Sequence, residues 1–386
     1  MPFELTEEQR LIQKTTREFA RKTLMATADE RDKTKEFPAE NLKKMGELGL
    51  MGMLVPSEYG GDDLDTLSYS LALTEIAYAC ASTAVIMSVH ASIVCGSLTR
   101  FGTPTQKEAY LRPLASADLI GSFALTEPDA GSDPSALQTT AEREGNSYRL
   151  NGIKRFITGG ATSGLFIVLA RDPSSSGHKG ISAFLVTPDM QGFQTGRIED
   201  KMGLRASDTC DLIFSNCRVP AGNLLGREGE GFKIAMSGLD AGRIGIASQS
   251  LGVGMAALDA AVKYAKTRRQ FDQPIAAFQG LRWMLAEMAL DVECARLLVW
   301  NAAAMKDRGE ACAAQASMAK LYASEMANRV TGQAIQIHGG YGVTKEYAVE
   351  RLYRDARVFT IYEGTSQIQK IVIANDLLKD KQRKKP

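Results

Sequence analysis

The residue with the clearest chemical potential is a carboxylate near the C-terminus, Glu363, which stands between Tyr362 and Gly364. A carboxylate in such a setting suits a desolvated general base, because loss of water raises its pKa and its basicity. Gly364 has no β-carbon, so a bound molecule can approach the backbone closely. Taken alone, a glutamate is typical of a solvated surface, so its neighbouring motifs decide between the two interpretations.

Two runs of small polar residues could bind an anion. Thr365 and Ser366 can cap a following helix, whose amide N–H groups would then face a phosphate. Thr126 offers a hydroxyl, and Gly131 and Ser132 offer backbone N–H groups to a phosphate or a carbonyl. The same stretch is rich in turn-forming residues, so a plain surface turn is the alternative.

The elements that must position these residues change type twice along the chain. Residues 1–121 show helical spacing, with Thr6 as an N-cap, a helix start at Pro38 and an interruption at Gly60 and Gly61. Residues 122–229 show short β runs separated by turns. The four predicted strands are Ser147–Asn151, Leu165–Ala170, Ile181–Thr187 and Asp211–Val219.

Helical spacing returns in residues 230–386, where three apolar stripes with many small residues favour close helix packing in a bundle. The sequence therefore predicts an α+β multidomain fold. Its parts are an N-terminal all-α domain (1–121), a middle β-sheet or β-barrel domain (122–229) and a C-terminal four-helix bundle (230–386). The stripes are Ile244, Ala247, Leu251, Leu258, Val262 and Ala265; Leu281, Leu285, Met288, Val292, Ala295 and Val299; and Ala316, Ala319, Ala323, Met326, Val330 and Ile337.

Composition restricts the class of protein. The chain has 386 residues, of which 44% are hydrophobic and 24% charged, as in a globular protein of two or three domains. A net charge of +1 gives no footprint for nucleic acid or a membrane surface. Six cysteines without C-x-x-C spacing and three histidines disfavour a metal site and favour a reducing compartment. Residues 81–99 fit a buried helix better than a membrane span, no signal peptide is expected, and the predicted location is cytoplasmic.

Three long motifs carry a resemblance to a known family. They are Phe123-Ala-Leu-Thr-Glu-Pro-Asp-Ala-Gly-Ser-Asp133, Gln336-Ile-His-Gly-Gly-Tyr-Gly342 and Ile361-Tyr-Glu-Gly-Thr-Ser366. In order and spacing they resemble the acyl-CoA dehydrogenase family, and the match extends from Leu5 to Ile371. The stretches Ala81–Val89 and Gly242–Gln249 are most similar to the short-chain, butyryl-CoA type.

The resemblance implies a reaction on an acyl-CoA thioester. A base removes the α proton, the β hydride passes to flavin N5, and trans-2-enoyl-CoA and reduced FAD result. Glu363 would be the base, and its own N–H together with a flavin ribityl hydroxyl would polarise the thioester carbonyl. Such a site must stabilise the developing enolate and exclude water.

The resemblance also implies binding residues. Asp240, Arg243, Gly364 and Ser132 would contact the acyl-CoA substrate, with Arg243 a charge-assisted donor. His338 is expected to be a structural histidine. The implied FAD contacts are Phe123, Leu125, Thr126, Gly131, Ser132, Phe156, Ile157, Thr158, Arg268, Phe271, Gln279, Gln336, Ile337, Gly339, Gly340, Thr365, Ser366 and Gln367.

Two positions distinguish this chain among relatives. Most of them carry tryptophan at the position of Phe156, so the smaller ring leaves the width of the pocket and the shielding of the flavin edge open. A minority place the base at the position of Gly242. Glycine cannot act as a base, which leaves the role to Glu363.

The resemblance further implies a homotetramer, a dimer of dimers, in which Arg268, Phe271, Gln279 and the 336–340 segment reach the FAD of a neighbouring subunit. An electron-transferring flavoprotein would accept the electrons, in fatty acid β-oxidation or branched-chain amino acid degradation. The mitochondrial matrix is the expected location for a eukaryotic source. Alternatives are a dehydrogenase of 2-methyl-branched or alicyclic acyl-CoA, an acyl-CoA oxidase, and a non-catalytic helical binding protein. No Rossmann G-x-G-x-x-G, P-loop, zinc-protease or serine-elbow motif is present.

Overall fold

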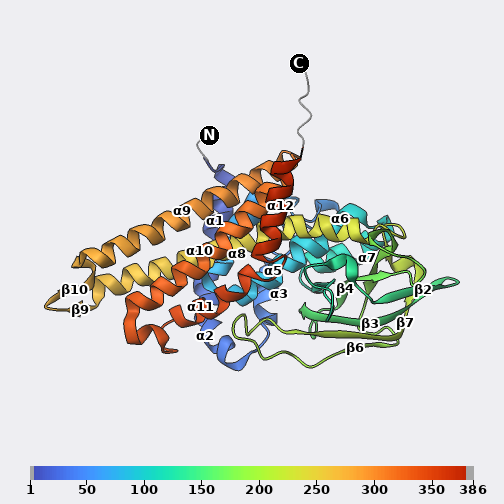
Figure 1. The fold of residues 1–386 in the computed structure, drawn as a ribbon, viewed down its shortest axis with the longest axis horizontal. Coiled ribbons are helices and arrows are strands. Elements are labelled where there is room, and N and C mark those ends of the chain that lie inside the picture. The colour runs from blue at the N-terminus through green and yellow to red at the C-terminus, as the bar shows by residue number, and fades with distance from the viewer. Residues whose placement is uncertain (1–3, 380–386) are drawn as a thin grey trace, which may run out of the picture.

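The computed structural model describes residues 4–379 and has a helical part, a β part and a second helical part in chain order (Figure 1). The β part occupies one end of the molecule, and three long helices of the second helical part extend toward the other end. The predicted α+β architecture is confirmed.

The N-terminal helices begin where the sequence indicates. Thr6 Oγ1 accepts from the Gln9 N–H at 3.1 Å and Gln9 Oε1 accepts from the Thr6 N–H at 3.1 Å, which makes a reciprocal capping box. Pro38 precedes a helix, and Gly60 adopts a φ of +83° before the next one. The helices are α1 (Glu7–Phe19), α2 (Met25–Thr34), α3 (Ala39–Glu47), α4 (Thr66–Ala79), α5 (Ala81–Ser88), α6 (Gly96–Phe101) and α7 (Pro104–Ala115).

A π-helical turn, Val89–Cys95, joins α5 to α6 and makes one continuous helical run from Ala81 to Phe101. By length and composition this run and Gly231–Thr267 could each cross a membrane, but 94% and 72% of their most apolar windows are buried inside the protein. They are core helices, as expected for residues 81–99. The π turn contacts both the first strand and the long helix α8 (Gly231–Thr267), so it lies at the junction of the three parts.

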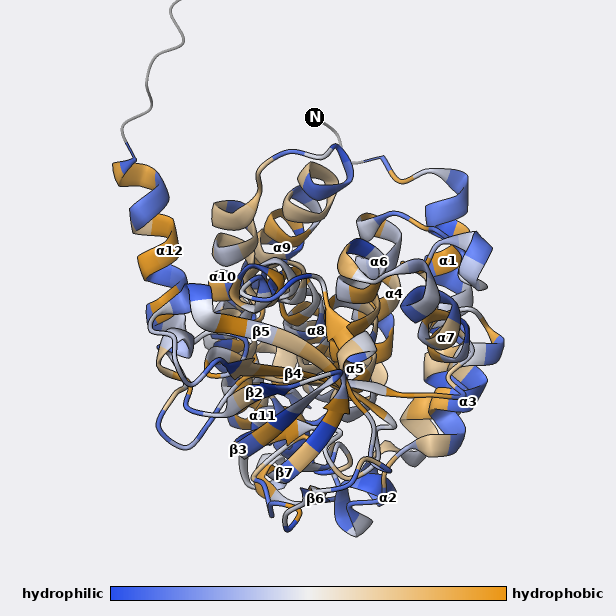
Figure 2. Cartoon of the chain, turned by 90° about the vertical axis from the view of Figure 1, so that its right-hand side faces the viewer, coloured by the Kyte–Doolittle hydropathy of each residue, from blue (hydrophilic) through white to orange (hydrophobic). Residues whose placement is uncertain are grey.

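The β part is one mixed sheet in the order β6-β7-β3-β2-β4-β5-β8, with β1 added parallel to β4. β4 and β5 are buried on both faces except at Arg171, whereas blue and orange alternate along β3 and β7 in Figure 2, as in strands with one solvated face. The strands are β1 (Gly121–Ala124), β2 (Thr140–Glu144), β3 (Ser147–Thr158), β4 (Leu165–Arg171), β5 (Ile181–Val186), β6 (Phe193–Thr195), β7 (Thr209–Pro220) and β8 (Leu224–Leu225).

The C-terminal part is built on α8, which has 37 residues and packs against α10, α4 and α9. The predicted stripes face this core: all six stripe residues of α10 are buried, and four of the six are buried on each of α8 and α9. Thr365 caps the last helix by accepting from the Ile368 N–H at 3.3 Å, as predicted. The elements are α8 (Gly231–Thr267), β9 (Arg269–Gln270), β10 (Gln273–Pro274), α9 (Gln279–Asp307), α10 (Ala313–His338), α11 (Val349–Ala356) and α12 (Ser366–Leu378).

Candidate active site

The site centres on Glu363, in the loop between α11 and α12. The residue is partly exposed as a whole, but both carboxylate oxygens are sealed from solvent. Neither oxygen has a hydrogen-bond partner among residues 4–379. Burying a carboxylate without hydrogen-bond donors costs free energy. An unpartnered buried carboxylate is therefore expected where the partner is a bound molecule and not a residue of the chain.

Burial raises the pKa of Glu363 from 4.5 to about 7, and the positive charges of Lys320 and Arg243 oppose that rise. The carboxyl group therefore titrates near neutral pH. A base with its pKa near the working pH combines a substantial ionised fraction with useful basicity.

The backbone at the base is bent into an unusual conformation. Glu363 has a φ of +49° and Gly364 a φ of +92°, and the first of these is strained for a residue with a side chain. Two side chains hold the bend from inside. Lys320 Nζ donates to the Gly364 carbonyl at 2.7 Å, and Gln369 Nε2 donates to the Gly364 and Glu363 carbonyls at 2.9 and 3.2 Å.

Helix α8 lies directly against the carboxylate. A β-carbon built on Gly242 would come 2.1 Å from Glu363 Oε2 and 3.2 Å from Ile93 Cδ1. The next residue, the buried Arg243, pairs with Asp240 at 2.6 Å, and its Nε has no partner within residues 4–379. A buried guanidinium with a spare N–H can accept an anionic or carbonyl group of a ligand.

The two predicted flavin segments of the β part are adjacent. The Arg155 N–H donates to the Thr126 carbonyl at 2.8 Å, which brings Phe123, Leu125 and Thr126 beside the end of β3. Ile157 is buried beneath that surface, while Gly131 and Ser132 lie in an exposed turn. An added β-carbon on Gly131 would meet no atom within 4 Å, so the backbone there is open to a ligand.

A buried ion pair fastens these segments together. Lys154 Nζ lies 2.7 Å from Glu127 Oε1 and 3.2 Å from the Leu125 carbonyl, and neither charged side chain is more than 5% exposed. Burial lowers the pKa of Lys154 to about 8 although Glu127 opposes the change. Burial alone would raise the pKa of Glu127, but Lys154 and the Gln138 N–H lower it on balance.

Phe156 stands out from the strand surface. Its side chain is 58% exposed, its φ is +58°, and it lies at an irregularity in the β3–β7 pairing between Lys154 and Ile157. The bulge turns the ring outward, where the Arg155 guanidinium covers it at 4.9 Å. A large apolar ring exposed on a strand surface is suited to contact with a planar ligand.

Of the other predicted FAD contacts, Thr365, Ser366 and Gln367 follow Glu363 directly at the start of α12, whereas those at residues 268–279 and 336–340 lie far from it. Arg268 follows the last residue of α8 and Gln279 begins α9, and Figure 1 shows β9 and β10 at the opposite end of the molecule from the β part. At 1.5 Å per residue, Gly242 and Arg268 are roughly 39 Å apart along the helix. A single chain therefore does not bring these two groups of residues together.

This far group is itself compact. The Arg268 guanidinium lies 5.5 Å from the centre of the Tyr341 ring, next to the end of α10 that carries Gln336, Ile337, Gly339 and Gly340. His338 is buried, its Nδ1–H donates to the Ala334 carbonyl at 2.7 Å, and its ring stacks on that of Tyr264 with the ring centres 4.2 Å apart. Its predicted structural role is confirmed.

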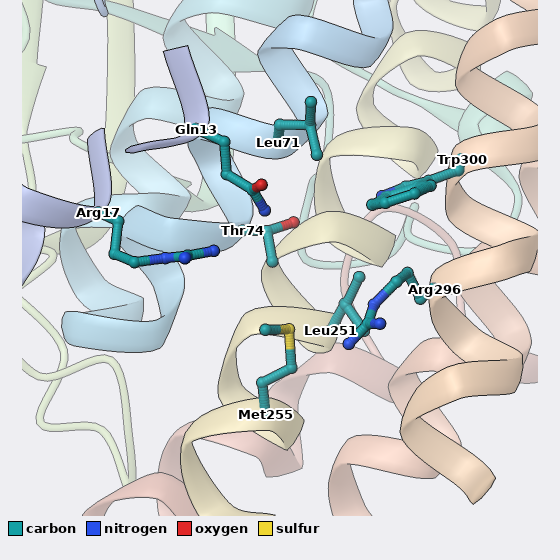
Figure 3. A pocket seen from close by; sticks show the side chains of 8 residues that line it. All are labelled: Gln13, Arg17, Leu71, Thr74, Leu251, Met255, Arg296 and Trp300. Atoms are coloured by element: carbon teal, nitrogen blue, oxygen red, sulfur yellow. The ribbon is translucent and has the colours of Figure 1, made fainter. Parts of the chain in front are cut away.

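A separate cavity of about 260 Å³ lies among α1, α4, α8 and α9 (Figure 3). Its charged groups are satisfied within the chain, since Arg17 pairs with Glu75 at 2.7 Å and Arg296 pairs with Glu293 at 2.7 Å. None of its lining residues belongs to the predicted site, and we assign it no part in the chemistry.

Sequence reasoning missed Lys320 and Gln369, which hold the Glu363 bend, and Gln249, which accepts from the Tyr362 hydroxyl. A signal for Lys320 was present: it lies four residues after Ala316 and three before Ala323, inside an apolar stripe. A lysine at such a position is expected to have a buried partner.

Comparisons with known proteins place the chain in a family. Residues 6–118, 122–217 and 229–378 match the N-terminal, middle and C-terminal domain models of acyl-CoA dehydrogenase, so the chain belongs to the acyl-CoA dehydrogenase family. It is 50% identical to the mitochondrial short-chain specific acyl-CoA dehydrogenase of Rattus norvegicus, over 97% of this chain and 91% of that protein.

Two solved structures are similar throughout. Butyryl-CoA dehydrogenase from Megasphaera elsdenii has a TM-score of 0.96 and 43% identity, over 98% of this chain and 100% of that one. A chain described with the electron transferring flavoprotein of Acidaminococcus fermentans has a TM-score of 0.97 and 48% identity, over 98% and 100%.

Proposed function

We propose that this protein is an FAD-dependent dehydrogenase of short-chain acyl-CoA thioesters, with Glu363 as the base. The observation that carries the proposal is the Glu363 carboxylate, which is sealed from solvent, has no partner in residues 4–379 and abuts Gly242. The short-chain preference is supported by the rat and Megasphaera relatives, whose names specify short-chain and butyryl-CoA substrates.

The chain's own groups divide the work as follows. Glu363 takes the α proton of the thioester, and its pKa of about 7 leaves a useful ionised fraction at neutral pH. The Glu363 N–H makes no backbone hydrogen bond within residues 4–379 and is free to donate to the thioester carbonyl, which stabilises the developing enolate. Arg243, steadied by Asp240, and the backbone at Gly364 and Ser132 orient the CoA thioester.

The residues present fit FAD. The backbone at Gly131, Gly339 and Gly340 is open to close approach by a ligand, because an added β-carbon at each would meet no atom within 4 Å. Phe156 gives an exposed ring beside Thr158. When bound, FAD supplies the acceptor for the β hydride. A relative from Mycobacterium smegmatis, 32% identical over 97% of this chain, is described in complex with FADH2.

We assign the following residues to the cofactor: Phe123, Leu125, Thr126, Gly131, Ser132, Phe156, Ile157, Thr158, Thr365, Ser366 and Gln367 from one subunit, and Arg268, Phe271, Gln279, Gln336, Ile337, Gly339 and Gly340 from its neighbour.

The wide separation of these two groups supports an FAD site shared between subunits in a homotetramer. An apolar stripe on α9 supports the assembly as well, because Trp283, Leu290 and Leu297 are 61%, 65% and 44% exposed at seven-residue intervals. Phe271, at the tip beside β9, is 85% exposed. A second copy of the chain would cover these surfaces.

We further propose that an electron-transferring flavoprotein accepts the electrons, a role supported by the Acidaminococcus structure. The proposed pathway is the degradation of fatty acids or of branched-chain amino acids. The protein would act in the cytoplasm of a bacterium or in the mitochondrial matrix of a eukaryote. We also propose that the chain has three domains, with limits at residues 1–121, 122–229 and 230–386.

The test is an anaerobic titration of the purified holoenzyme with butyryl-CoA. The flavin absorbance should bleach in the native enzyme, while Glu363→Gln should bind the ligand without bleaching. Bleaching of the variant at the native rate would remove Glu363 from its role. A colourless protein that cannot be reconstituted with FAD would instead favour a helical binding protein.

The same purified enzyme can be tested for two related activities. A panel of substrates from four to about sixteen acyl carbons, with branched and alicyclic members, ranks the short-chain proposal against its alternative, since each methylene in an apolar pocket changes selectivity by roughly 1–3 kcal/mol. Rapid reoxidation of the substrate-reduced enzyme in air would identify an oxidase.

A further inference from the structure

Lys320 is a buried cation for which the proposed chemistry gives no role. It lies on α10, the residue is 0% exposed, and its Nζ donates to the Gly364 carbonyl at 2.7 Å. A lysine is almost never fully buried without a partner, because removing an ammonium group from water is costly. Its Nζ hydrogen bond is to a neutral carbonyl, which alone does not offset a buried charge.

The largest compensating charge is that of the base itself, ahead of that of Glu325 on the same helix. Glu363 precedes Gly364, and the Glu363 carboxylate is the largest favourable electrostatic partner of the Lys320 ammonium. Burial lowers the pKa of Lys320 to about 8 and Glu363 opposes that change, while Lys320 in turn lowers the pKa of Glu363. Each charge therefore stabilises the other inside the protein.

The other groups around Glu363 do not supply this charge in the same way. Arg243 on α8 also lowers the pKa of Glu363, but its guanidinium is already paired with Asp240 at 2.6 Å. Tyr69 on α4 and the adjacent Tyr362 are buried phenols whose pKa values are raised by burial, so both are neutral. Of the two cations that act on Glu363 within the described part of the chain, Lys320 is therefore the one that forms no salt bridge with another residue.

We infer that Lys320 is a positioning residue with two functions: it holds the Glu363–Gly364 bend through the Gly364 carbonyl, and its charge sets the pH range in which Glu363 is ionised. Gln369 makes the same backbone contact without a charge, since its Nε2 donates to the Gly364 carbonyl at 2.9 Å. The chain thus contains a matched pair of donors to one carbonyl atom, and only one of them is charged.

The inference rests on the proposed role of Glu363, so native enzyme and Glu363→Gln are first compared by anaerobic bleaching. Failure at that step would refute the proposed function itself. The profile of kcat/KM against pH with butyryl-CoA is then measured for native holoenzyme, Lys320→Met, Lys320→Gln and Gln369→Met. FAD content and thermal unfolding are recorded for each variant.

Loss of the positive charge should raise the pKa of Glu363, so the rising limb of the profile should move to higher pH by about one unit in both Lys320 variants. At pH 6, kcat/KM of these variants should therefore be about tenfold lower than that of the native enzyme. This factor comes in addition to any loss of activity that the variants also show at high pH. Lys320→Gln retains a donor and should keep more activity at high pH than Lys320→Met. Gln369→Met should lower activity without moving the limb.

Three results would overturn the inference. They are an unshifted limb in both Lys320 variants, an equal shift in Gln369→Met, and failure of both Lys320 variants to fold while Gln369→Met folds. The last result would show that Lys320 serves stability and not the base.

Discussion

Gly242 on α8 and Glu363 share one space: a β-carbon on the glycine would lie 2.1 Å from Glu363 Oε2. The absence of a side chain at residue 242 is what allows the carboxylate to point inward from the α11–α12 loop. A base supplied from position 242 and one supplied from position 363 would therefore reach the same place, and they exclude each other sterically.

Gly242→Ala tests this relationship. The added methyl group should displace the carboxylate, and a misplacement of about 1 Å lowers kcat about 100-fold. Gly238→Ala is a matched control one turn earlier on the helix, where the β-carbon would meet Ile93 Cγ2 at 3.1 Å and not Glu363. Steady-state kinetics with butyryl-CoA and FAD content distinguish the two variants. An unchanged kcat in Gly242→Ala would show that the carboxylate works from elsewhere.

The activity should depend on pH with a single rising limb near neutrality. Glu363 acts in its ionised form, and its pKa is raised from 4.5 to about 7, so kcat/KM should fall about tenfold per pH unit below that value. The measurement is kcat/KM with butyryl-CoA between pH 5 and pH 9, over about four units. A plateau that extends down to pH 5 would contradict burial of the carboxylate in the free enzyme.

Stability should change with pH in the opposite direction. A carboxyl whose pKa is higher in the folded state favours folding while it is protonated, and that contribution is lost as pH rises from 4.5 to about 7. Glu363→Gln removes the penalty, so its free energy of unfolding should exceed the native value by up to about 3 kcal/mol at pH 8. The two proteins should converge near pH 4.5. Urea unfolding of both holoenzymes at the two pH values measures this difference.

The buried Lys154–Glu127 pair should be needed for flavin retention. Glu127→Gln leaves the Lys154 ammonium buried without its counter-charge, which costs about 3–5 kcal/mol and frees the Leu125–Thr126 segment. Glu142→Gln is the control in the same sheet, because the Arg149–Glu142 pair is exposed and worth about 1 kcal/mol or less. Denaturant unfolding and the flavin-to-protein absorbance ratio report both effects. Equal losses in the two variants would contradict a special role for the buried pair.

Charge on the α9 stripe should separate the subunits and release FAD together. Leu290→Glu places a carboxylate in the surface formed with Trp283 and Leu297, and burying it in an interface without a partner is costly. Leu11→Glu on α1 is the control, since Leu11 is 64% exposed, similar to Leu290 at 65%. Sedimentation velocity monitored at the flavin wavelength should show smaller, colourless particles only for Leu290→Glu. A coloured monomer would contradict a shared FAD site.

The amino-acid sequence by itself determined the order of the parts and most element types. Helical and β periodicities are local properties, so the stripe of Ala316, Ala319 and Ala323 and the β runs at Leu165–Ala170 and Ile181–Thr187 were predictable. The caps at Thr6 and Thr365 were predictable as well, because a cap involves residues three positions apart.

Only the tertiary structure decided which distant residues meet. β1, β2 and β6 have three to five residues each, too few for a periodic signal, and β1 is defined by its parallel pairing with β4. Lys320 and Glu363 are brought together by packing of α10 against the C-terminal segment, and Gly242 joins them from α8. Burial then raises the pKa of the Glu363 carboxylate, because desolvation depends on every element that surrounds it and not on its neighbours in the chain.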